Sequence, residues 1–366
     1  MPADPHHRCG LVVALQANYC WVELTPAAAA EAGQSQRLLC TRRTRLAKSG
    51  QTICVGDRVR LEGIDWPSGR AAIAAVASRS SLVRRPAVAN VSRVVVVVAL
   101  AEPALDPIQL TRFLITAESS GQPVLLVFSK ADLLPEADVR QWCERAAAWG
   151  YRALPVSCRS GGGLETLRER LSQPGLAVVC GPSGVGKSSL LNALHPELEL
   201  QVGAVSGRLQ RGRHTTRHVE LFALAPGALV ADTPGFNRPE LPADPARLAG
   251  LFPEVRQRLA HASCQFRDCL HQGEPGCAVG SDWERHPWYG LCLHDLQEQQ
   301  HRFQRQGQQR GGDHQRLRQR GDRLEPRLSP QLRQPSRRRQ RQGLDTETEQ
   351  AGEAGGPGFS PPDPAG

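Results

Sequence analysis

A glycine-rich segment that ends in lysine and serine constrains this chain more than any other feature. Residues 181–188 read G-P-S-G-V-G-K-S and fit the pattern G-x-x-x-x-G-K-[S/T]. An apolar run over residues 176–180 precedes the segment, and residues 189–194 have the composition of a helix. A strand, a glycine-rich loop and a helix in this order bring backbone N–H groups around phosphate oxygens. The segment therefore predicts nucleotide binding, with Lys187 at the β and γ phosphates and Ser188 on Mg²⁺.

The surrounding sequence predicts an α/β domain built around this loop. From residue 91 to about residue 251, apolar runs alternate with helical stretches, as in βαβ units on a parallel sheet. Residues 94–100, 124–128, 176–180 and 228–231 are continuously apolar, which is typical of strands buried on both faces. We assign residues 81–250 to this central α/β domain of a multidomain chain.

A second motif in the same domain indicates which base is bound. The run over residues 124–128 leads directly into S-K-A-D, whose Asp132 follows the carboxyl end of a strand, where ligands bind in such sheets. A carboxylate there can accept from N1–H and N2–H₂ of guanine, a donor pair that adenine lacks. Ser157 and Cys158 follow a later strand end and could offer a backbone N–H to the guanine oxygen. The pattern favours GTP, and an ATP-using enzyme remains the alternative, which Asp132→Asn would test with xanthosine triphosphate.

Two further segments downstream predict the rest of a magnesium and γ-phosphate site. Asp232 opens D-T-P-G after the run over residues 228–231, so it would hold Mg²⁺ through water while the Gly235 N–H senses the γ phosphate. Between the two motifs, G-R-H-T-T-R supplies Thr215 and Thr216, either of which could complete the Mg²⁺ shell from a loop that the γ phosphate orders.

The sequence offers one candidate for the residue that orients the attacking water. Many GTPases place a glutamine directly after the D-x-x-G glycine, whereas this chain has Phe236, so unaided hydrolysis should be slow. His214 is the nearest polar substitute, because a neutral imidazole can position water or accept its proton. Its other reading is an RNA or phosphate contact beside Arg213. The predicted catalytic group is completed by Lys187 and the two threonines of the loop.

The N-terminal region has the pattern of a small β-barrel. Five short strand-like runs occur between residues 8 and 78, separated by Gly, Asn and Pro, which suits a five-stranded OB fold. We assign residues 1–80 to this OB-fold domain. A basic cluster of Arg42, Arg43, Arg45 and Lys48 lies between the third and fourth runs. It is either a solvated loop or an RNA contact, since no aromatic residues accompany it.

Four potential metal ligands lie within fourteen residues near the end of the ordered sequence. Cys264, Cys269, His271 and Cys277 supply three thiolates and an imidazole at short spacings, which a tetrahedral structural Zn²⁺ requires. The alternative is a set of reduced cysteines near a histidine. We assign residues 251–300 to a helical zinc-binding domain. A zinc-containing nucleic-acid-binding module that holds nucleotide only as a structural ligand is the second alternative function, and a GTP hydrolysis assay would separate the two.

Composition and charge limit the remaining possibilities. The longest apolar run, residues 94–101, is far shorter than a membrane span, and eleven irregularly spaced cysteines do not form a disulfide framework. We therefore expect a cytoplasmic protein with no membrane association. Residues 301–344 carry 13 Arg and 3 acidic residues, so this segment has a charge of +10 and the rest of the +9 chain sums to −1. Residues 301–366 are predicted to be a disordered basic tail, either a salt-dependent contact with nucleic acid or a solubilising segment.

The order of the motifs carries a family resemblance. S-K-A-D and V-S-C precede G-P-S-G-V-G-K-S, H-T-T and D-T-P-G, which is a circular permutation of the usual GTPase order. This order, with V-G-D-R-V at residues 55–59, R-P-A-V-A-N-V at residues 85–91 and the cysteine motif, resembles the RsgA family of circularly permuted GTPases, also called YjeQ/YloQ-like. Two departures are Ser129, where the family usually has Asn, and Cys158, where a small residue is usual.

The resemblance implies a fold and a function. It implies an OB-fold barrel, a circularly permuted P-loop GTPase and a C-terminal zinc domain. It also implies a monomeric GTP hydrolase that binds the small (30S) ribosomal subunit and its rRNA late in maturation, is stimulated by it and dissociates after hydrolysis to GDP. The motifs and the resemblance assign to GTP the residues Ser129, Lys130, Ala131, Asp132, Ser157, Cys158, Gly181, Pro182, Ser183, Gly184, Val185, Gly186, Lys187, Ser188, Ser189, Asp232 and Gly235. Zinc is assigned to Cys264, Cys269, His271 and Cys277, and magnesium to Ser188, Thr216 and Asp232.

Overall fold

The N-terminal region is a five-stranded barrel, as predicted. The computed structural model describes residues 8–16, 19–25, 37–43, 52–84, 87–198, 219–232, 239–309, 317–320 and 323–326. The barrel strands are β1 (Arg8–Gln16), β2 (Tyr19–Leu24), β3 (Arg37–Arg42), β4 (Arg58–Asp65) and β5 (Arg70–Val76). They follow the order β1-β2-β3-β5-β4, and pairing of β1 with β4 closes the barrel. Alternate residues of each strand point inward and form a separate apolar core.

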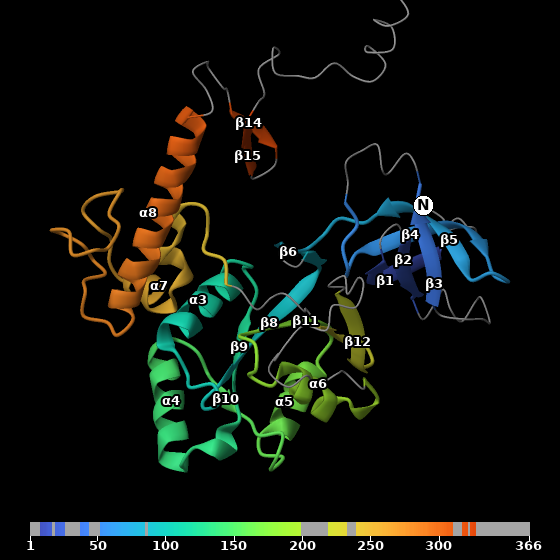
Figure 1. Ribbon diagram of the computed structural model, residues 1–366, viewed down its shortest axis with the longest axis horizontal. Helices are drawn as coiled ribbons and strands as arrows, with labels where there is room; N and C mark the ends of the chain where they lie inside the picture. The colour runs from blue at the N-terminus through green and yellow to red at the C-terminus, as the bar shows by residue number, and fades with distance from the viewer. Residues whose placement is uncertain are drawn as a thin grey trace, which may run out of the picture. The chain divides into compact units, whose positions relative to one another are not determined.

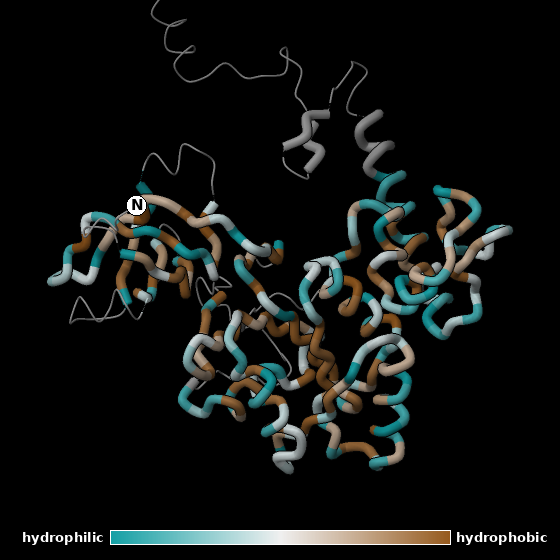
Figure 2. Tube along the Cα trace, turned by 180° about the vertical axis from the view of Figure 1, so that it is seen from behind, coloured by the Kyte–Doolittle hydropathy of each residue, from teal (hydrophilic) through white to brown (hydrophobic). Residues whose placement is uncertain are grey.

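The central domain is a mostly parallel sheet with helices beside it (Figure 1). Its strands run in the order β10 (Leu154–Pro155), β9 (Val124–Ser129), β8 (Val91–Ala99), β11 (Gly175–Cys180), β13 (Ala228–Asp232) and β12 (Glu220–Ala225). The helices are α3 (Pro107–Glu118), α4 (Glu136–Ala148), α5 (Leu164–Leu171) and α6 (Lys187–Leu194). Most residues of β8, β9 and β11 are buried. Figure 2 shows hydrophobic segments gathered inside the central domain, with others in the barrel and the C-terminal region. The continuous apolar runs thus form the buried strands that they predict.

The barrel and the central sheet join through a strand that the sequence pattern did not reveal. β12 runs antiparallel to β13 and pairs with β1 of the barrel, so one sheet continues from the central domain into the barrel. A short hairpin of β6 (Leu82–Arg84) and β7 (Ala87–Ala89) lies along the connection. Barrel and central residues share a hydrophobic cluster, which includes Val13 and Val55 on one side and Val91 and Leu221 on the other. The barrel thus has its own core and also shares a second cluster with the central domain, and the boundary near residue 80 remains a prediction.

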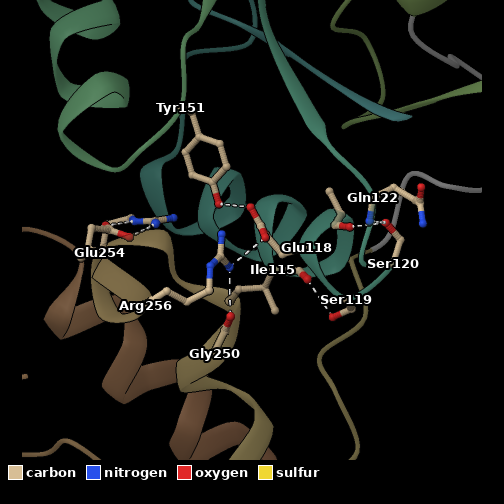
Figure 3. A network of polar contacts seen from close by, with 11 residues as sticks. Ile115, Glu118, Ser119, Ser120, Gln122, Tyr151, Gly250, Glu254 and Arg256 are labelled. Atoms are coloured by element: carbon tan, nitrogen blue, oxygen red, sulfur yellow. Dashed lines mark hydrogen bonds and ion pairs between the residues drawn. The ribbon is translucent and has the colours of Figure 1, made fainter. Parts of the chain in front are cut away.

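The C-terminal part of the described chain packs on helices α3 and α4. Two short 3₁₀ turns (Pro245–Arg247 and Ala249–Leu251) and α7 (Pro253–Leu259) precede the cysteine segment, and α8 (His286–Gln309) follows it. Figure 3 shows Tyr151 and Arg256 directed at the carboxylate of Glu118, the last residue of α3. The Tyr151 hydroxyl donates to Glu118 at 3.1 Å, and Arg256 donates to it at 2.9 Å. These contacts attach α7 to the central domain.

The tail contains more regular structure than the sequence indicates. Helix α8 continues to Gln309, nine residues past the predicted start of the tail, and β14 (Leu317–Arg320) pairs antiparallel with β15 (Arg323–Pro326). The remaining residues of the predicted tail lie outside those described. Within the described chain, no helix has both the length and the apolar character that crossing a bilayer would require.

Candidate functional site

The phosphate loop folds as its glycines require. Gly181 follows β11 with φ of +145°, and a Cβ there would lie 1.9 Å from the carbonyl oxygen of Val97, so no larger residue fits. Gly186 directly precedes helix α6, which begins at Lys187. The Lys187 ammonium donates to the carbonyl oxygens of Gly181 and Pro182 at 2.9 and 2.6 Å. The positive charge therefore lies inside the loop, at the start of a helix, where phosphate oxygens would be favoured.

The two motifs assigned to the base meet beside each other. The Ala131 N–H donates to the carbonyl oxygen of Val156 at 3.1 Å, which joins S-K-A-D to the strand end before Ser157. Burial raises the pKa of the Cys158 thiol, and the nearby charge of Asp132 raises this pKa further. The carboxylate of Asp132 thus lies close to the loop that would offer its N–H groups to the base.

Ser129 connects the base-reading loop to the phosphate loop. Its side chain is buried, and its hydroxyl lies 2.6 Å from the carbonyl oxygen of Val185 and 3.2 Å from that of Val98. Val185 belongs to the phosphate loop and Val98 to β8, so one hydroxyl at the end of β9 contacts two other segments of the fold. The sequence did not predict these partners, because they lie 56 and 31 residues away along the chain.

All of these segments lie at one edge of the sheet. Ala99 pairs with Ser129 across β8 and β9, Cys180 pairs with Val96, and Asp232 ends β13. Parallel strands place their carboxyl ends along the same edge, and ligands of such sheets bind there. Of the remaining predicted site residues, His214, Thr215, Thr216, Gly235 and the side chain of Asp232 lie outside the part that the structure describes.

Lys130 has a role that the motif alone does not indicate. Its backbone adopts the left-handed conformation with φ of +55°, and its ammonium donates to the carbonyl oxygen of Glu102. Glu102 lies in the loop after β8 and also has a positive φ of +52°. Lys130 therefore connects the loop after β9 to the loop after β8, at the edge of the sheet where the phosphate loop lies.

The four predicted zinc ligands converge in space. Their ligand atoms lie within 4.8 Å of one another, and the Nδ1 atom of His271 lies 3.5, 3.6 and 3.5 Å from the sulfurs of Cys264, Cys269 and Cys277. A tetrahedral Zn²⁺ bound at about 2.3 Å to sulfur and about 2.0 Å to nitrogen would hold those atoms about 3.5 Å apart. The donor set and its spacing therefore fit a structural zinc ion. Burial lowers the pKa of His271, which favours the neutral ring that a metal requires.

Residues outside the ligand set hold this centre in shape. The carboxylate of Glu274 accepts from the N–H groups of Leu270 and Gln272 at 2.9 and 2.6 Å, which closes the turn around His271. The Nε2 atom of His286 lies 3.2 Å from the carbonyl oxygen of His271. Sequence reasoning missed both, although the position of Glu274 three residues before the last cysteine is a signal that could have suggested it.

Comparisons with known proteins agree with the geometry. The family model described as RsgA GTPase matches residues 76–242. The small ribosomal subunit biogenesis GTPase RsgA of Parasynechococcus marenigrum is 57% identical over 289 residues, which are 79% of this chain and 96% of that protein. The RsgA protein of Trichormus variabilis is 46% identical and covers 92% of this chain and 95% of its own length.

Solved structures show the same architecture. The crystal structure of YjeQ from Thermotoga maritima superposes with a TM-score of 0.65 at 30% identity, covering 79% of this chain and 98% of its own. The structure of YloQ, a circularly permuted GTPase, gives a TM-score of 0.64 at 26% identity, covering 82% of this chain and 98% of its own. With the permuted motifs at one sheet edge and the Cys₃His group, this chain belongs to the RsgA family of small ribosomal subunit biogenesis GTPases and is a GTP hydrolase.

Proposed function

We propose that this GTPase binds the small ribosomal subunit in its GTP form, assists late maturation, and leaves after the subunit stimulates hydrolysis. The observation that carries the proposal is the meeting of the base-reading and phosphate loops at one sheet edge, where Ser129 joins them, in a chain that also has a barrel and a Cys₃His centre. Barrels of this kind and zinc modules commonly bind RNA, which suits an rRNA partner.

The proposed roles follow from the placement of each group. Lys187 would neutralise the β and γ phosphates, because its ammonium lies inside the phosphate loop. Asp132 would accept from the guanine N1–H and N2–H₂. Ser188, Thr216 and Asp232 would hold Mg²⁺, which when bound offsets negative charge on the phosphate oxygens. The other loop residues assigned to GTP would surround the phosphates and base with backbone N–H groups.

The experiment that tests the proposal compares subunits side by side. GTP hydrolysis is measured with no addition, with purified small subunits and with purified large subunits. We expect stimulation by small subunits only, since recognition depends on one rRNA surface. Equal rates under all three conditions would contradict the proposal and favour a plain nucleotide-binding module. Release is measured in the same system, and we expect a non-hydrolysable GTP analogue to slow dissociation from the small subunit relative to GTP.

We propose His214 as the group that orients the attacking water, because Phe236 cannot hydrogen-bond to water. The variant His214→Ala should bind GTP with nearly unchanged affinity and show a lower stimulated turnover, by about a hundredfold or more. Nucleotide affinity and stimulated turnover are measured on the same preparation. Unchanged turnover would remove His214 from the mechanism and leave it as an RNA or phosphate contact.

The basic tail is proposed to strengthen binding to rRNA. Residues 301–344 carry a charge of +10, and phosphate contacts of this kind weaken steeply as salt rises. Deleting residues 301–366 should therefore flatten the dependence of subunit affinity on salt concentration. An unchanged salt dependence would show that the tail only solubilises the chain.

A further inference from the structure

Pairing across three neighbouring strands connects Ala14 of the barrel to Asp232, the proposed magnesium ligand at the end of β13. Ala14 of β1 pairs with Glu220, the first residue of β12. Glu220 also pairs with Asp232, the last residue of β13. The pair of Glu220 and Asp232 is thus the terminal rung of the β12–β13 ladder, and Glu220 is the link between this rung and the barrel.

The side chain of Arg37, on barrel strand β3, forms an ion pair with Glu220. The Arg37 guanidinium of β3 lies 2.9 Å from the Glu220 carboxylate, and the two side chains are 45% and 42% exposed. The same guanidinium lies over the ring of Trp21 on β2, 5.1 Å from its centre. A cation stacked on an aromatic ring is restrained in its orientation. The Trp21 ring therefore helps to orient the Arg37 guanidinium toward Glu220.

Apolar packing on the opposite face of β12 completes the attachment. Val219 and Leu221 flank Glu220 and are buried in the cluster that Trp21 packs against. Successive residues of a strand point to opposite faces. The start of β12 is therefore held by apolar contacts on one face and by Arg37 on the other. The attachment lies where the ladder would otherwise fray, because the ends of strands open most easily.

We propose that Arg37 is a positioning residue for magnesium-dependent GTP binding, supplied by the barrel, which fixes through Glu220 the terminal rung that carries Asp232. The inference rests on the proposed assignment of Asp232 to Mg²⁺. Arg37 acts by restraining the backbone of Glu220, and through it the backbone of Asp232, in the geometry that the magnesium site needs. The barrel is then a structural part of the nucleotide site as well as a separate binding domain.

The proposal predicts an effect that depends on magnesium. Arg37→Ala and Glu220→Gln should each weaken the affinity for a non-hydrolysable GTP analogue in Mg²⁺ by about two- to fivefold, the range expected for a half-exposed ion pair. In EDTA, where Asp232 has no metal to position, both variants should bind the analogue as the unmodified chain does. Arg37→Lys keeps the charge and should retain most of the affinity.

The experiment measures affinity of the full chain for a fluorescent GTP analogue by titration, in Mg²⁺ and in EDTA. The double variant Arg37→Ala/Glu220→Gln should be no weaker than either single variant, because both remove the same contact. The exchanged pair Arg37→Glu/Glu220→Arg should recover affinity. Arg140→Ala is the matched control, since it breaks an exposed ion pair of 3.0 Å within helix α4, far along the chain from β12.

Three results would overturn the proposal. They are a loss no larger than that of Arg140→Ala, an equal loss in EDTA, and losses that add in the double variant. Each of these leaves binding by the unmodified chain intact. Failure of the proposed function is a different outcome, in which the unmodified chain shows no stimulation by small subunits.

Discussion

At the scale of single residues, the hydroxyl of Ser129 connects the base-reading loop to the phosphate loop. A hydroxyl carries one hydrogen, so Ser129 can donate to only one of the two carbonyl oxygens that face it. The oxygen of Val185 is nearer, at 2.6 Å against 3.2 Å for that of Val98. The bond to the phosphate loop is therefore the stronger one, and an asparagine at this position would bring a second donor.

Ser129→Ala should weaken GTP binding without changing the choice of base. The substitution leaves a buried carbonyl of the phosphate loop without its donor, which costs about 1–3 kcal/mol and corresponds to an affinity loss of about fivefold to a hundredfold. Affinities for GTP, ATP and xanthosine triphosphate analogues check the prediction.

Asp132→Asn is the contrasting variant, because it should weaken GTP and admit xanthosine triphosphate. If Ser129→Ala also changed the preferred base, Ser129 would contact the base directly and the tethering interpretation would be wrong.

At the scale of elements, a buried guanidinium attaches the zinc-binding region to the central domain. The side chain of Arg285 is 1% exposed and donates through Nε to Glu254 of α7 at 2.7 Å. The rings of Phe252, Trp149 and Tyr151 face it at 4.8, 5.2 and 5.5 Å. Trp149 and Tyr151 follow helix α4, so one cation joins α7, the start of α8 and the central domain.

Arg285→Ala should destabilise the chain by about 3–5 kcal/mol, because it leaves the Glu254 carboxylate buried without its partner. Urea unfolding of the full chain measures the change. Arg302→Ala breaks an exposed pair with Glu298 on α8 and should cost less than about 0.5 kcal/mol. The double variant Arg285→Met/Glu254→Leu should recover much of the loss, since it removes both charges together. A loss for Arg285→Ala as small as for Arg302→Ala would show that the pair carries little of the attachment.

At the scale of the whole molecule, the barrel and the zinc-binding region are attached to different elements of the central domain. The barrel is joined through β12, whereas the zinc-binding region contacts α3 and the end of α4. The nucleotide edge itself is built from β8, β9 and β11 and their following loops. Among the described residues, these contacts attach the zinc-binding region to the central domain through α3 and the end of α4 and not through the strands of the nucleotide edge.

Removing zinc with a strong chelator should open residues 264–277 while nucleotide affinity stays unchanged. Structural zinc supplies folding free energy to the segment that binds it, so its amides should exchange with solvent much faster without the metal. Hydrogen exchange followed by mass spectrometry reports the segment, and titration with a GTP analogue reports the site. Cys264→Ser should give the same pattern. A parallel loss of nucleotide affinity would show that the zinc region supports the nucleotide edge.

The sequence by itself determined the barrel, the buried parallel strands, the phosphate loop and the zinc ligands. These features are local, since the phosphate loop occupies eight consecutive residues and the metal ligands lie within fourteen, so composition and spacing reveal them. The extent of α8 and the strand β12 were missed, because Gln- and Arg-rich or short mixed segments have weak periodicity.

Only the tertiary structure decided which distant residues hold these parts together. Ser129 reaches Val185 across 56 residues, Arg285 reaches Glu254 across 31, and Arg37 reaches Glu220 across 183. No local pattern encodes such pairs, because each polar side chain could equally face solvent until the chain packs. Their partners are fixed by which strands and helices become neighbours in the folded chain.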